Sequence, residues 1–464
     1  MQNRSALITL VAMYFFWGSV AASLDILIPI FQSHFTLSPI TSQLTSSAFF
    51  IAYFVGALVY FLISMNGIDI LNKIGYKKGL IMGLSISTIG ILGFLLASSF
   101  NSYTLFLLAL FIVAFGFSFQ QIVVNPLIIQ IGSPETGSQR VSLGGSLFGI
   151  GATLAPLLLS AAIYGSLQNT DQLIDLTNIN LPAIILAGLF VLSMLIISRV
   201  ELPIAAASEA IEKELGALKF PQLKWGMAAI FVYVGVEVSI GSNLSKYLQE
   251  NRNFTIVESA SLVSLYWGSI MIGRWAASVD VFKLSRANEV IAKIIVPFLA
   301  FGMVWFINDL KGGNTGEFLN YIPFIIVAVI ALLISGKDSA KTLIILGLLA
   351  SALILLGLFT SGSVAMFCFI SGGLFCSVMW PCIFNLAIAG LGKYTNQGSS
   401  LLIMMIIGGA IIPLFQGYLA SLIGYHLSYF LAIVCFVFLA FYGWYTNRVL
   451  LAQGIKLNNE SNGH

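Results

Sequence analysis

Residues 15–31 read FFWGSVAASLDILIPIF and place one acidic residue, Asp25, inside an apolar run. About 20 apolar residues in a helix cross the hydrocarbon core of a bilayer, so this stretch belongs to a predicted membrane span. A carboxylate in hydrocarbon costs at least about 2.5 kcal/mol. It is therefore retained where it faces protein or a watery cavity, and it marks a functional site by default. We expect Asp25 to project into such a cavity.

The composition of the whole chain is typical of a helical protein with many membrane spans. Of its 464 residues, 58% are hydrophobic and 8% are charged; a soluble domain carries about 25% charged residues. The net charge of +3 is not gathered in a basic patch, so nucleic acid is not an expected partner. The expected partners are the lipid bilayer and a small molecule, and no obligate protein partner is evident.

Several kinds of chemistry are disfavoured by what the sequence lacks. The four cysteines lie in apolar runs without metal-ligand spacing and the three histidines are scattered, so we expect no metal and no cofactor. No acid–histidine constellation indicates an enzyme. No phosphate-binding GxxxxGK[ST] motif occurs, which disfavours ATP-driven transport by this chain alone.

Hydropathy predicts an all-α polytopic protein with about fourteen spans, on the rule of about 20 apolar residues per span. We expect an N-terminal six-helix bundle over 1–200, a cytoplasmic linker over 201–224, a C-terminal bundle over 225–447 and a tail over 448–464. The two surplus spans form an inserted hairpin at about 288–340. Because the hairpin enters and leaves on one side of the membrane, it preserves the orientation of all later spans. We expect it to pack at the periphery of the transport helices.

Lys and Arg side chains fall mainly on one side of the predicted spans. With the N-terminus inside, 17 of the 21 lie on the inner side. Only Lys246, Arg252 and Lys311 lie outside, and Arg274 lies within a span near its inner end, where a long side chain can reach the membrane surface. The positive-inside rule therefore predicts a cytoplasmic (inner) membrane protein with both termini in the cytoplasm.

The two halves share a pattern that indicates a parallel internal repeat. NPLIIQIGSPETGSQR is followed by GATLAPLLL in the first half, and WPCIFNLAIAGLGKYTNQGSS by GGAIIPLFQ in the second. Each half has a Pro late in one span (Pro126, Pro381), a loop with Gly, Thr and Gln, and a Gly-rich span with its own Pro (Pro156, Pro413). Such repeats are typical of transporters built from two halves that hold substrate near the midplane.

Two acids are candidates for binding a coupling ion or a substrate hydroxyl. They are Asp25 and Glu237, which lies in FVYVGVEVSIGSNL of the first span of the second half. A buried carboxyl can load and release a proton near neutral pH. The structural alternative for each is an acid satisfied by polar neighbours, with no role in turnover.

Polar and aromatic residues inside the spans are candidates for lining a sugar site. Gln121 and Asn125 share a helix face in QQIVVNP, beside a backbone carbonyl that Pro126 frees. Amides suit hydroxyl-rich ligands, and the alternative is hydrogen bonding between helices. The comparable amides of the second half are Asn385 and Gln416. The aromatic side chains that could stack on a sugar are Trp17, Tyr266, Trp267 and Trp380.

These stretches resemble the major facilitator superfamily, and within it the fourteen-helix branch of bacterial glucose/galactose permeases. The resemblance covers nearly the whole chain and is most specific in SVMWPCIFNLAIAGLG (377–392) and GGAIIPLFQG (408–417). It implies uptake of a hexose by alternating access, coupled to a cation, with the proton favoured over sodium. It matches Asp25 and Glu237 to acidic residues of the family, and Gln121 to the second acid of the fucose permeases.

Three departures from the resemblance keep alternatives open. Leu24, Gly145 and Phe148 stand where the family has polar side chains that help bind sugar. A less polar first-half pocket would suit a transporter of a less polar solute, or an exporter. A further alternative is a membrane sensor that binds sugar without moving it.

Overall fold

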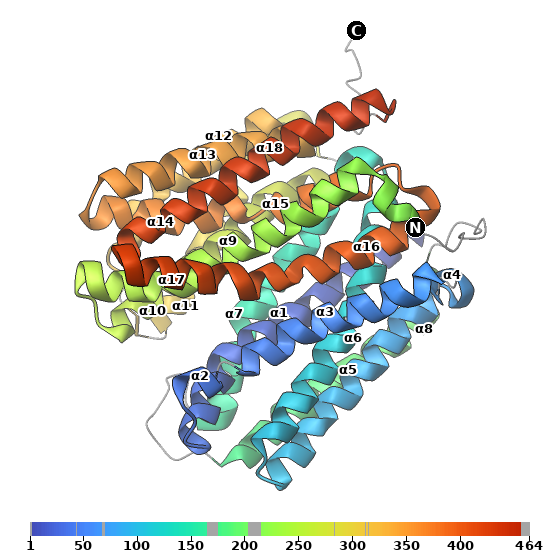
Figure 1. Ribbon diagram of the computed structural model, residues 1–464, viewed down its shortest axis with the longest axis horizontal. Helices are drawn as coiled ribbons and strands as arrows, with labels where there is room; N and C mark the ends of the chain where they lie inside the picture. The colour runs from blue at the N-terminus through green and yellow to red at the C-terminus, as the bar shows by residue number, and fades with distance from the viewer. Residues whose placement is uncertain are drawn as a thin grey trace. The chain divides into compact units, whose positions relative to one another are not determined.

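The computed structural model describes residues 2–42, 44–66, 70–164, 175–202, 215–282, 284–310, 312–313 and 315–455. These residues form helices joined by short turns, and no strand occurs among them (Figure 1). The prediction of an all-α fold is thereby confirmed.

The described residues of the first half of the chain form eight α-helices and two short 3₁₀ turns. They are α1 (Gln2–His34), α2 (Pro39–Ser42), α3 (Leu44–Met65), α4 (Ile70–Ile74), α5 (Tyr76–Ser99), α6 (Tyr103–Gln130), η1 (Pro134–Thr136), α7 (Gly137–Tyr164), η2 (Leu176–Ile179) and α8 (Asn180–Arg199).

The second half begins after a third short turn, η3 (Gly216–Lys219). It contains α9 (Pro221–Arg252), α10 (Ile256–Ser278), η4 (Val279–Phe282), α11 (Arg286–Leu310), η5 (Phe318–Tyr321), α12 (Ile322–Ser335), α13 (Ser339–Phe359), α14 (Gly362–Cys376), α15 (Met379–Ile388), η6 (Gly392–Tyr394), α16 (Thr395–Met404), η7 (Met405–Ile407), α17 (Gly408–Ser428) and α18 (Phe430–Ala452).

Thirteen helical stretches of the described chain are long and apolar enough to cross a membrane, with α14–α15 and α16–α17 counted as one stretch each. The long helix outside this set is α10, which contains Arg274 and several serines. Polar residues in a spanning helix face the protein interior, so α10 completes the predicted set of about fourteen spans.

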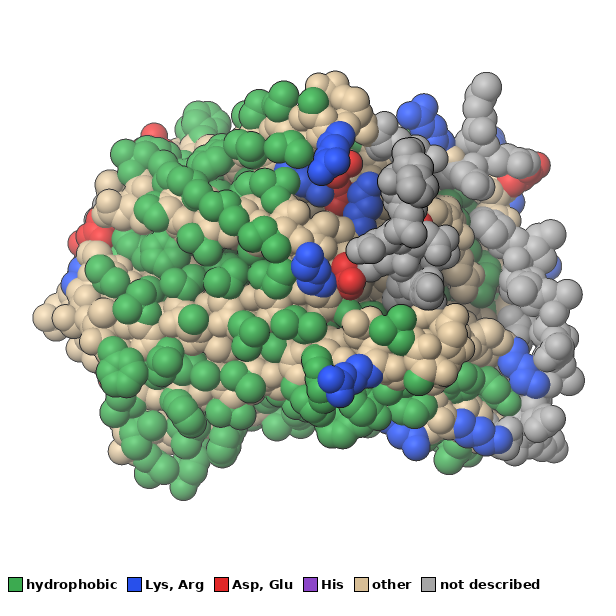
Figure 2. All heavy atoms as spheres, turned by 90° about the horizontal axis from the view of Figure 1, so that it is seen from above, with side chains coloured by type: hydrophobic (Ala, Val, Ile, Leu, Met, Phe, Trp, Pro, Cys, Tyr) green, Lys and Arg blue, Asp and Glu red, His purple; other side chains and the backbone are tan. Residues whose placement is uncertain are grey.

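Large hydrophobic side chains cover much of the surface. Phe359 is 83% exposed, Leu414 75% and Leu158 66%, and Figure 2 shows hydrophobic side chains spread over much of one face. Exposed apolar surface on this scale is unfavourable in water and favourable in lipid. The chain is therefore a multi-pass membrane protein.

The chain divides into two compact units that largely follow its halves. Unit 1 comprises Met1–Ile131, Leu147–Lys219 and Leu391–Met404, and unit 2 comprises Gly132–Ser146, Phe220–Gly390 and Met405–His464. Two segments are grouped with the unit of the other half: the first turns of α7 belong to unit 2, and α16 belongs to unit 1.

The helices of the two units pack in the same order. In unit 1, α5 packs against α6 and α8, and α3 against α6. In unit 2, α13 packs against α14 and α18, and α10 against α14. By this correspondence α11 and α12 are the surplus pair, which lies against α10 and α13 in the region where the sequence predicts the inserted hairpin.

Close helix contacts recur at matching positions of the repeat. Gly151 of α7 and Gly408 of α17 each stand five residues before a proline. An added Cβ at Gly151 would overlap the carbonyl of Phe15 on α1, and one at Gly408 would overlap the carbonyl of Phe231 on α9. Small residues of this kind let two backbones approach closely in a membrane.

The proline of α6 has the local consequence that its sequence predicts. Pro126 has no N–H to donate to the carbonyl of Ile122, four residues earlier in the helix. The hydroxyl of Ser399 on α16 donates to that carbonyl at 3.3 Å. A side chain from another helix of unit 1 thus compensates for the missing backbone hydrogen bond.

Candidate functional site

Glu237 is the centre of a charged group inside unit 2. Its carboxylate is 14% exposed and accepts a hydrogen bond from the hydroxyl of Tyr233, one turn earlier on α9, at 2.7 Å. The guanidinium of Arg274 on α10 lies 3.6 Å from the same oxygen, and its side chain is 12% exposed. A buried carboxylate is retained only when such partners compensate for lost hydration.

A helix break and a missing side chain position Arg274. Pro381 cannot donate to the carbonyl of Ser377, which lies in the gap between α14 and α15. The Nε of Arg274 donates to that carbonyl at 3.0 Å. On α7, an added Cβ at Gly145 would stand 2.6 Å from Arg274 Cδ and 3.0 Å from its Nε. The space that Gly145 leaves is therefore occupied by the arginine.

Aromatic side chains surround the Glu237 group. The ring of Trp380 on α15 lies 6.2 Å from the Tyr233 ring and stacks on Phe384 at 6.1 Å. The hydroxyl of Tyr266 on α10 donates to the backbone carbonyl of Glu237 at 2.6 Å. Three residues predicted to act in transport are thus brought together: Glu237, Tyr266 on its backbone carbonyl, and Trp380 through Tyr233.

A second polar group lies inside unit 1. The amide of Gln121 donates to the hydroxyl of Tyr53 on α3 at 2.9 Å. Asn125 is 1% exposed and its side-chain oxygen accepts from the hydroxyl of Tyr14 on α1. The Nδ2 of Asn125 has no hydrogen-bond partner among the described residues. A buried donor without a protein partner is uncommon in a folded protein, and a bound water or ligand is one explanation for it.

A third group of hydrogen-bonded side chains includes Gln120, the residue before Gln121, and is buried between helices. The indole of Trp17 on α1 donates to Gln120 at 3.0 Å, and Gln120 donates to Ser87 on α5 at 3.0 Å. Trp17 and Gln120 are 2% and 0% exposed. Each polar atom that joins these three helices has a protein partner, so the network has a structural role.

The region around Asp25 is only partly described. Its backbone belongs to α1, but its side chain lies outside the described residues. Leu24 is 6% exposed and lines a cavity of about 70 Å³ whose other walls are apolar side chains such as Phe94 and Leu159, with Ser23 as the one polar residue in the described lining. The carbonyl of Phe148 presses against Gly18 of α1. The backbone at Phe148 therefore packs closely against α1 within unit 1.

The remaining predicted residues lie in other surroundings. Asn385 donates to Ser339 at 3.1 Å, and Ser339 donates to Ser138 at 3.0 Å. Gln416 is 1% exposed, accepts from Ser239 and donates to Ser428 at 3.3 Å. These amides already have partners in unit 2 that a sugar would have to replace.

Trp267 is more exposed than the other aromatic candidates Trp17 and Tyr266, which are buried. It is 41% exposed, and its ring meets that of Tyr266 edge to face at 5.3 Å. This exposure separates it from the buried group around Glu237, whereas Trp380 is part of that group.

The Glu237 group can bind a cation or hydroxyls, but it is not built for metal. Among the described residues, no three His, Cys, Asp or Glu side chains come together as metal ligands. A carboxylate with one guanidinium and one phenol is able to exchange these partners for a proton or for a hydroxyl-bearing solute. Arg274 was not predicted to take part, and the one sequence signal for it was the presence of a charge within a span.

Known proteins resemble the whole of this chain. The sequence model of the family described as "Major Facilitator Superfamily" matches residues 6–336. A glucose/galactose transporter of Brucella abortus is 31% identical over 94% of this chain and 93% of its own length. An L-fucose-proton symporter of Escherichia coli is 24% identical over 91% of this chain and 89% of its own. The crystal structure of the transporter FucP in the outward conformation matches with a TM-score of 0.74 at 23% identity, over 96% of this chain and 99% of that one.

Proposed function

This chain belongs to the major facilitator superfamily, and from that premise we propose that it takes up a monosaccharide by alternating access. The observation that carries the proposal is the match, over nearly the full length of both chains, to a protein named glucose/galactose transporter. A hexose such as glucose or galactose is the proposed solute, and a proton the proposed coupling ion. The fucose-proton symporter among the relatives supports the choice of the proton.

Glu237 is the proposed coupling residue of unit 2. Its carboxylate holds Tyr233 and Arg274 while it is charged. Protonation removes the ion pair and leaves Arg274 attached to the Ser377 carbonyl. Protonation of the Glu237 carboxylate therefore changes which polar groups a solute contacts. Asp25, for which the family resemblance gives the same role, is the proposed coupling residue of α1.

Amides and one aromatic ring are proposed to bind the sugar. The open donor of Asn125 and the partly exposed Gln121 offer hydrogen bonds in unit 1. Trp380 offers a ring face in unit 2. The hydrogen bonds that hold Asn385 and Gln416, and the exposed position of Trp267, make these three the weaker candidates.

A less polar solute receives little support from the geometry. The alternative arises because Leu24, Gly145 and Phe148 stand where the family resemblance gives polar side chains. The side chain of Arg274 fills the space at Gly145, so at that position the loss of a polar group is offset by the presence of a guanidinium. A hydroxyl-rich solute remains the better match.

Uptake by the purified protein in proteoliposomes tests the proposal. Radiolabelled glucose, galactose, fucose and N-acetylglucosamine are offered with an imposed proton gradient or sodium gradient. We expect at least one hexose to accumulate with the proton gradient. Binding of a sugar without flux would identify a sensor, and movement of none of the sugars would overturn the proposal.

The coupling role is tested with Glu237→Gln and Asp25→Asn. We expect each variant to lose proton-driven accumulation by about tenfold or more, a change of at least about 1.4 kcal/mol. Sugar counterflow, which needs no net proton movement, should persist. Glu250→Gln on the exposed end of α9 is the matched control. If both acid variants accumulate sugar like the parent, the coupling assignment is wrong.

A further inference from the structure

Tyr53 on α3 contacts one of the residues predicted to line the sugar site. Its side chain is 3% exposed, and its hydroxyl accepts a hydrogen bond from Nε2 of Gln121 on α6 at 2.9 Å. Gln121 itself is half-buried, and both residues belong to unit 1. Nothing in the sequence distinguishes Tyr53 from the many other aromatic residues of the spans, so its contact with Gln121 is visible only in the folded chain.

Two close contacts hold the Tyr53 ring in place. One turn later on α3, an added Cβ at Gly56 would overlap the hydroxyl of Ser118 on α6 and would stand 3.2 Å from the carbonyl of Phe115. The Phe49 ring lies 5.2 Å from the Tyr53 ring. Because packed backbone and buried rings shift little, the Tyr53 hydroxyl has a fixed position relative to α6.

The hydrogen bond decides which end of the Gln121 amide is left for a solute. A carboxamide has one oxygen that accepts and one nitrogen that donates. The nitrogen is bound to Tyr53. The oxygen, Oε1, accepts from no described residue and, unlike the unpaired Nδ2 of Asn125, is not fully buried. The accessible group of Gln121 is therefore an acceptor.

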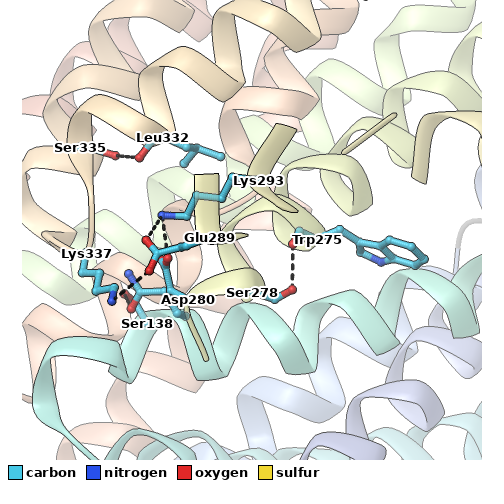
Figure 3. Close-up of polar contacts among 10 residues, drawn as sticks. Ser138, Trp275, Ser278, Asp280, Glu289, Lys293, Leu332, Ser335 and Lys337 are labelled. Atoms are coloured by element: carbon cyan, nitrogen blue, oxygen red, sulfur yellow. Dashed lines mark hydrogen bonds and ion pairs between the residues drawn. The ribbon is translucent and has the colours of Figure 1, made fainter. Parts of the chain in front are cut away.

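Other polar side chains inside the described part of the chain have partners on every side. Gln120 accepts from one neighbour and donates to another, and Gln416 does the same. The charged side chains drawn in Figure 3 also satisfy one another, since Lys293 lies 2.6 Å from Asp280. Gln121 differs because one end of its amide is held by the protein and the other end is open.

The Tyr53 hydroxyl is what keeps the amide in this orientation. The last torsion of a glutamine side chain has a broad, roughly two-fold profile, so the oxygen and nitrogen exchange places at little cost when nothing holds them. In the turned amide, an N–H group would face the solute in place of the oxygen. The two orientations favour different solutes, because the oxygen needs a hydroxyl that donates, whereas the N–H also binds a group that only accepts.

We propose that Tyr53 is a positioning residue of the sugar site, which turns the carbonyl oxygen of Gln121 toward a solute hydroxyl. This role rests on the proposed uptake of a monosaccharide. It requires the solute to have a free hydroxyl that donates at one ring position, next to an uncharged amide and an uncharged phenol. A site built to bind a hydroxyl rejects an analogue that lacks it, because the polar group of the site is then left unpaired.

Deoxy and deoxyfluoro sugars test the direction of the hydrogen bond, because fluorine replaces a hydroxyl in size but donates no proton. Analogues of glucose and galactose, substituted at each hydroxyl in turn, compete with radiolabelled glucose and galactose in counterflow. The position that meets Gln121 is the one whose substitution no longer matters in Gln121→Met. In the parent, we expect both analogues at that position to bind at least about fivefold more weakly than the hexose.

Tyr53→Phe should change selectivity more than rate. We expect the affinity for the hexose to fall about fivefold. The deoxyfluoro analogue should then bind within about threefold of the hexose, because the released amide offers an N–H group. The maximal rate of counterflow should change by less than about threefold, which assigns the effect to binding.

Two further variants separate positioning from a general effect of losing a hydroxyl. Adding Tyr53→Phe to Gln121→Met should cause no further loss of affinity, because the amide that Tyr53 orients is already absent. Tyr60→Phe is the matched control, since Tyr60 is a tyrosine of α3 that is 1% exposed. It should keep the selectivity of the parent.

Three results would overturn this role while leaving the proposed sugar transport in place. They are equal binding of the deoxyfluoro analogue and the hexose by the parent at the position identified, unchanged selectivity in Tyr53→Phe, and a further loss of affinity in the double variant. If Gln121→Met removes discrimination at no position, Gln121 does not bind the sugar and the role of Tyr53 is also wrong. A parent protein that binds none of these sugars would overturn the proposed function and this role together.

Discussion

At the scale of single residues, the absence of a side chain at position 145 is as informative as the charges nearby. Gly145 leaves the space in which the Arg274 side chain lies, and Arg274 in turn meets Glu237 and the carbonyl freed by Pro381. A glycine in the middle of a helix lowers helix stability. Its presence here is accounted for by the close approach of the guanidinium.

A larger residue at this position should disturb coupling. In Gly145→Gln the new side chain would displace Arg274 from Glu237, since even a Cβ would stand 2.6 Å from Arg274 Cδ. We expect proton-driven sugar accumulation to fall by about tenfold, or about 1.4 kcal/mol, while counterflow changes by less than about threefold. Uptake and counterflow in the same proteoliposomes provide the measurement.

Alanine variants control for the general effect of losing a helical glycine. Gly188 on α8 has no atom within 4 Å of an added Cβ, so Gly188→Ala should transport like the parent. Gly145→Ala should show a weaker form of the coupling defect. Equal behaviour of the two alanine variants and the parent, with normal coupling in Gly145→Gln, would show that Arg274 does not need this space.

The sequence predicts the acid of this site, Glu237, but not its partner Arg274. A charge inside a span is visible in the sequence because hydrophobic residues surround it, which is how Glu237 is found. Arg274 lies 37 positions later on another helix, and its position depends on the Pro381 break and on Gly145. Such contacts depend on how the helices pack and not on a local sequence pattern. The sequence alone therefore predicts only that the Arg274 side chain reaches the membrane surface.

At the scale of helices, the internal repeat is visible in the packing of the helices as well as in the sequence. Gly151 and Gly408 occupy matching positions, and each lets its helix approach a phenylalanine carbonyl on the first helix of its half. The order of packing of α3, α5, α6 and α8 recurs in α10, α13, α14 and α18. The correspondence of the two glycines can be predicted from the sequence, because each stands five residues before a proline and both residue types mark breaks in regular structure.

The two glycines should therefore be equally sensitive to an added methyl group. Gly151→Ala and Gly408→Ala each force a Cβ against backbone, which cannot shift as a side-chain end can. We expect each to be destabilised by about 1–3 kcal/mol and to lower the Tm of the detergent-purified protein. Because they contact different partners, Phe15 and Phe231, the Tm decreases should add in the double variant.

Gly302→Ala on α11 is the control for that experiment, because no atom lies within 4 Å of its added Cβ. Its Tm should equal or exceed that of the parent, since alanine favours a helix. An unchanged Tm in Gly151→Ala or Gly408→Ala would show that the helices can separate at no cost, contrary to the close contact described here.

At the scale of the whole molecule, hydropathy predicted the number of spans because lipid imposes one length on every crossing helix. The helix outside that set, α10, contains Arg274 and several buried serines. The sequence also located the surplus pair of helices. The contact it could not foresee is the buried pair of Asp280 and Lys293, because burial of two charged side chains depends on their meeting in the folded chain.

The orientation of the spans leads to the last prediction. The bias of Lys and Arg predicts that both termini are cytoplasmic, which requires an even number of crossings, including two by α11 and α12. Single cysteines are placed at exposed turns on both sides. Asn101→Cys, Asn251→Cys and Ser361→Cys should react with a membrane-impermeant maleimide in intact cells, and Asn66→Cys and Ser285→Cys only after permeabilisation.

The native cysteines should add little background to this labelling, because Cys368, Cys376, Cys382 and Cys435 are all buried. The pair formed by Asn251→Cys and Ser361→Cys decides whether the number of crossings between them is even or odd. Labelling of both in intact cells means an even number, as expected when α10, α11, α12 and α13 all cross. If Ser361→Cys is protected while Asn251→Cys reacts, the number is odd, and the predicted set of about fourteen spans with both termini in the cytoplasm is wrong.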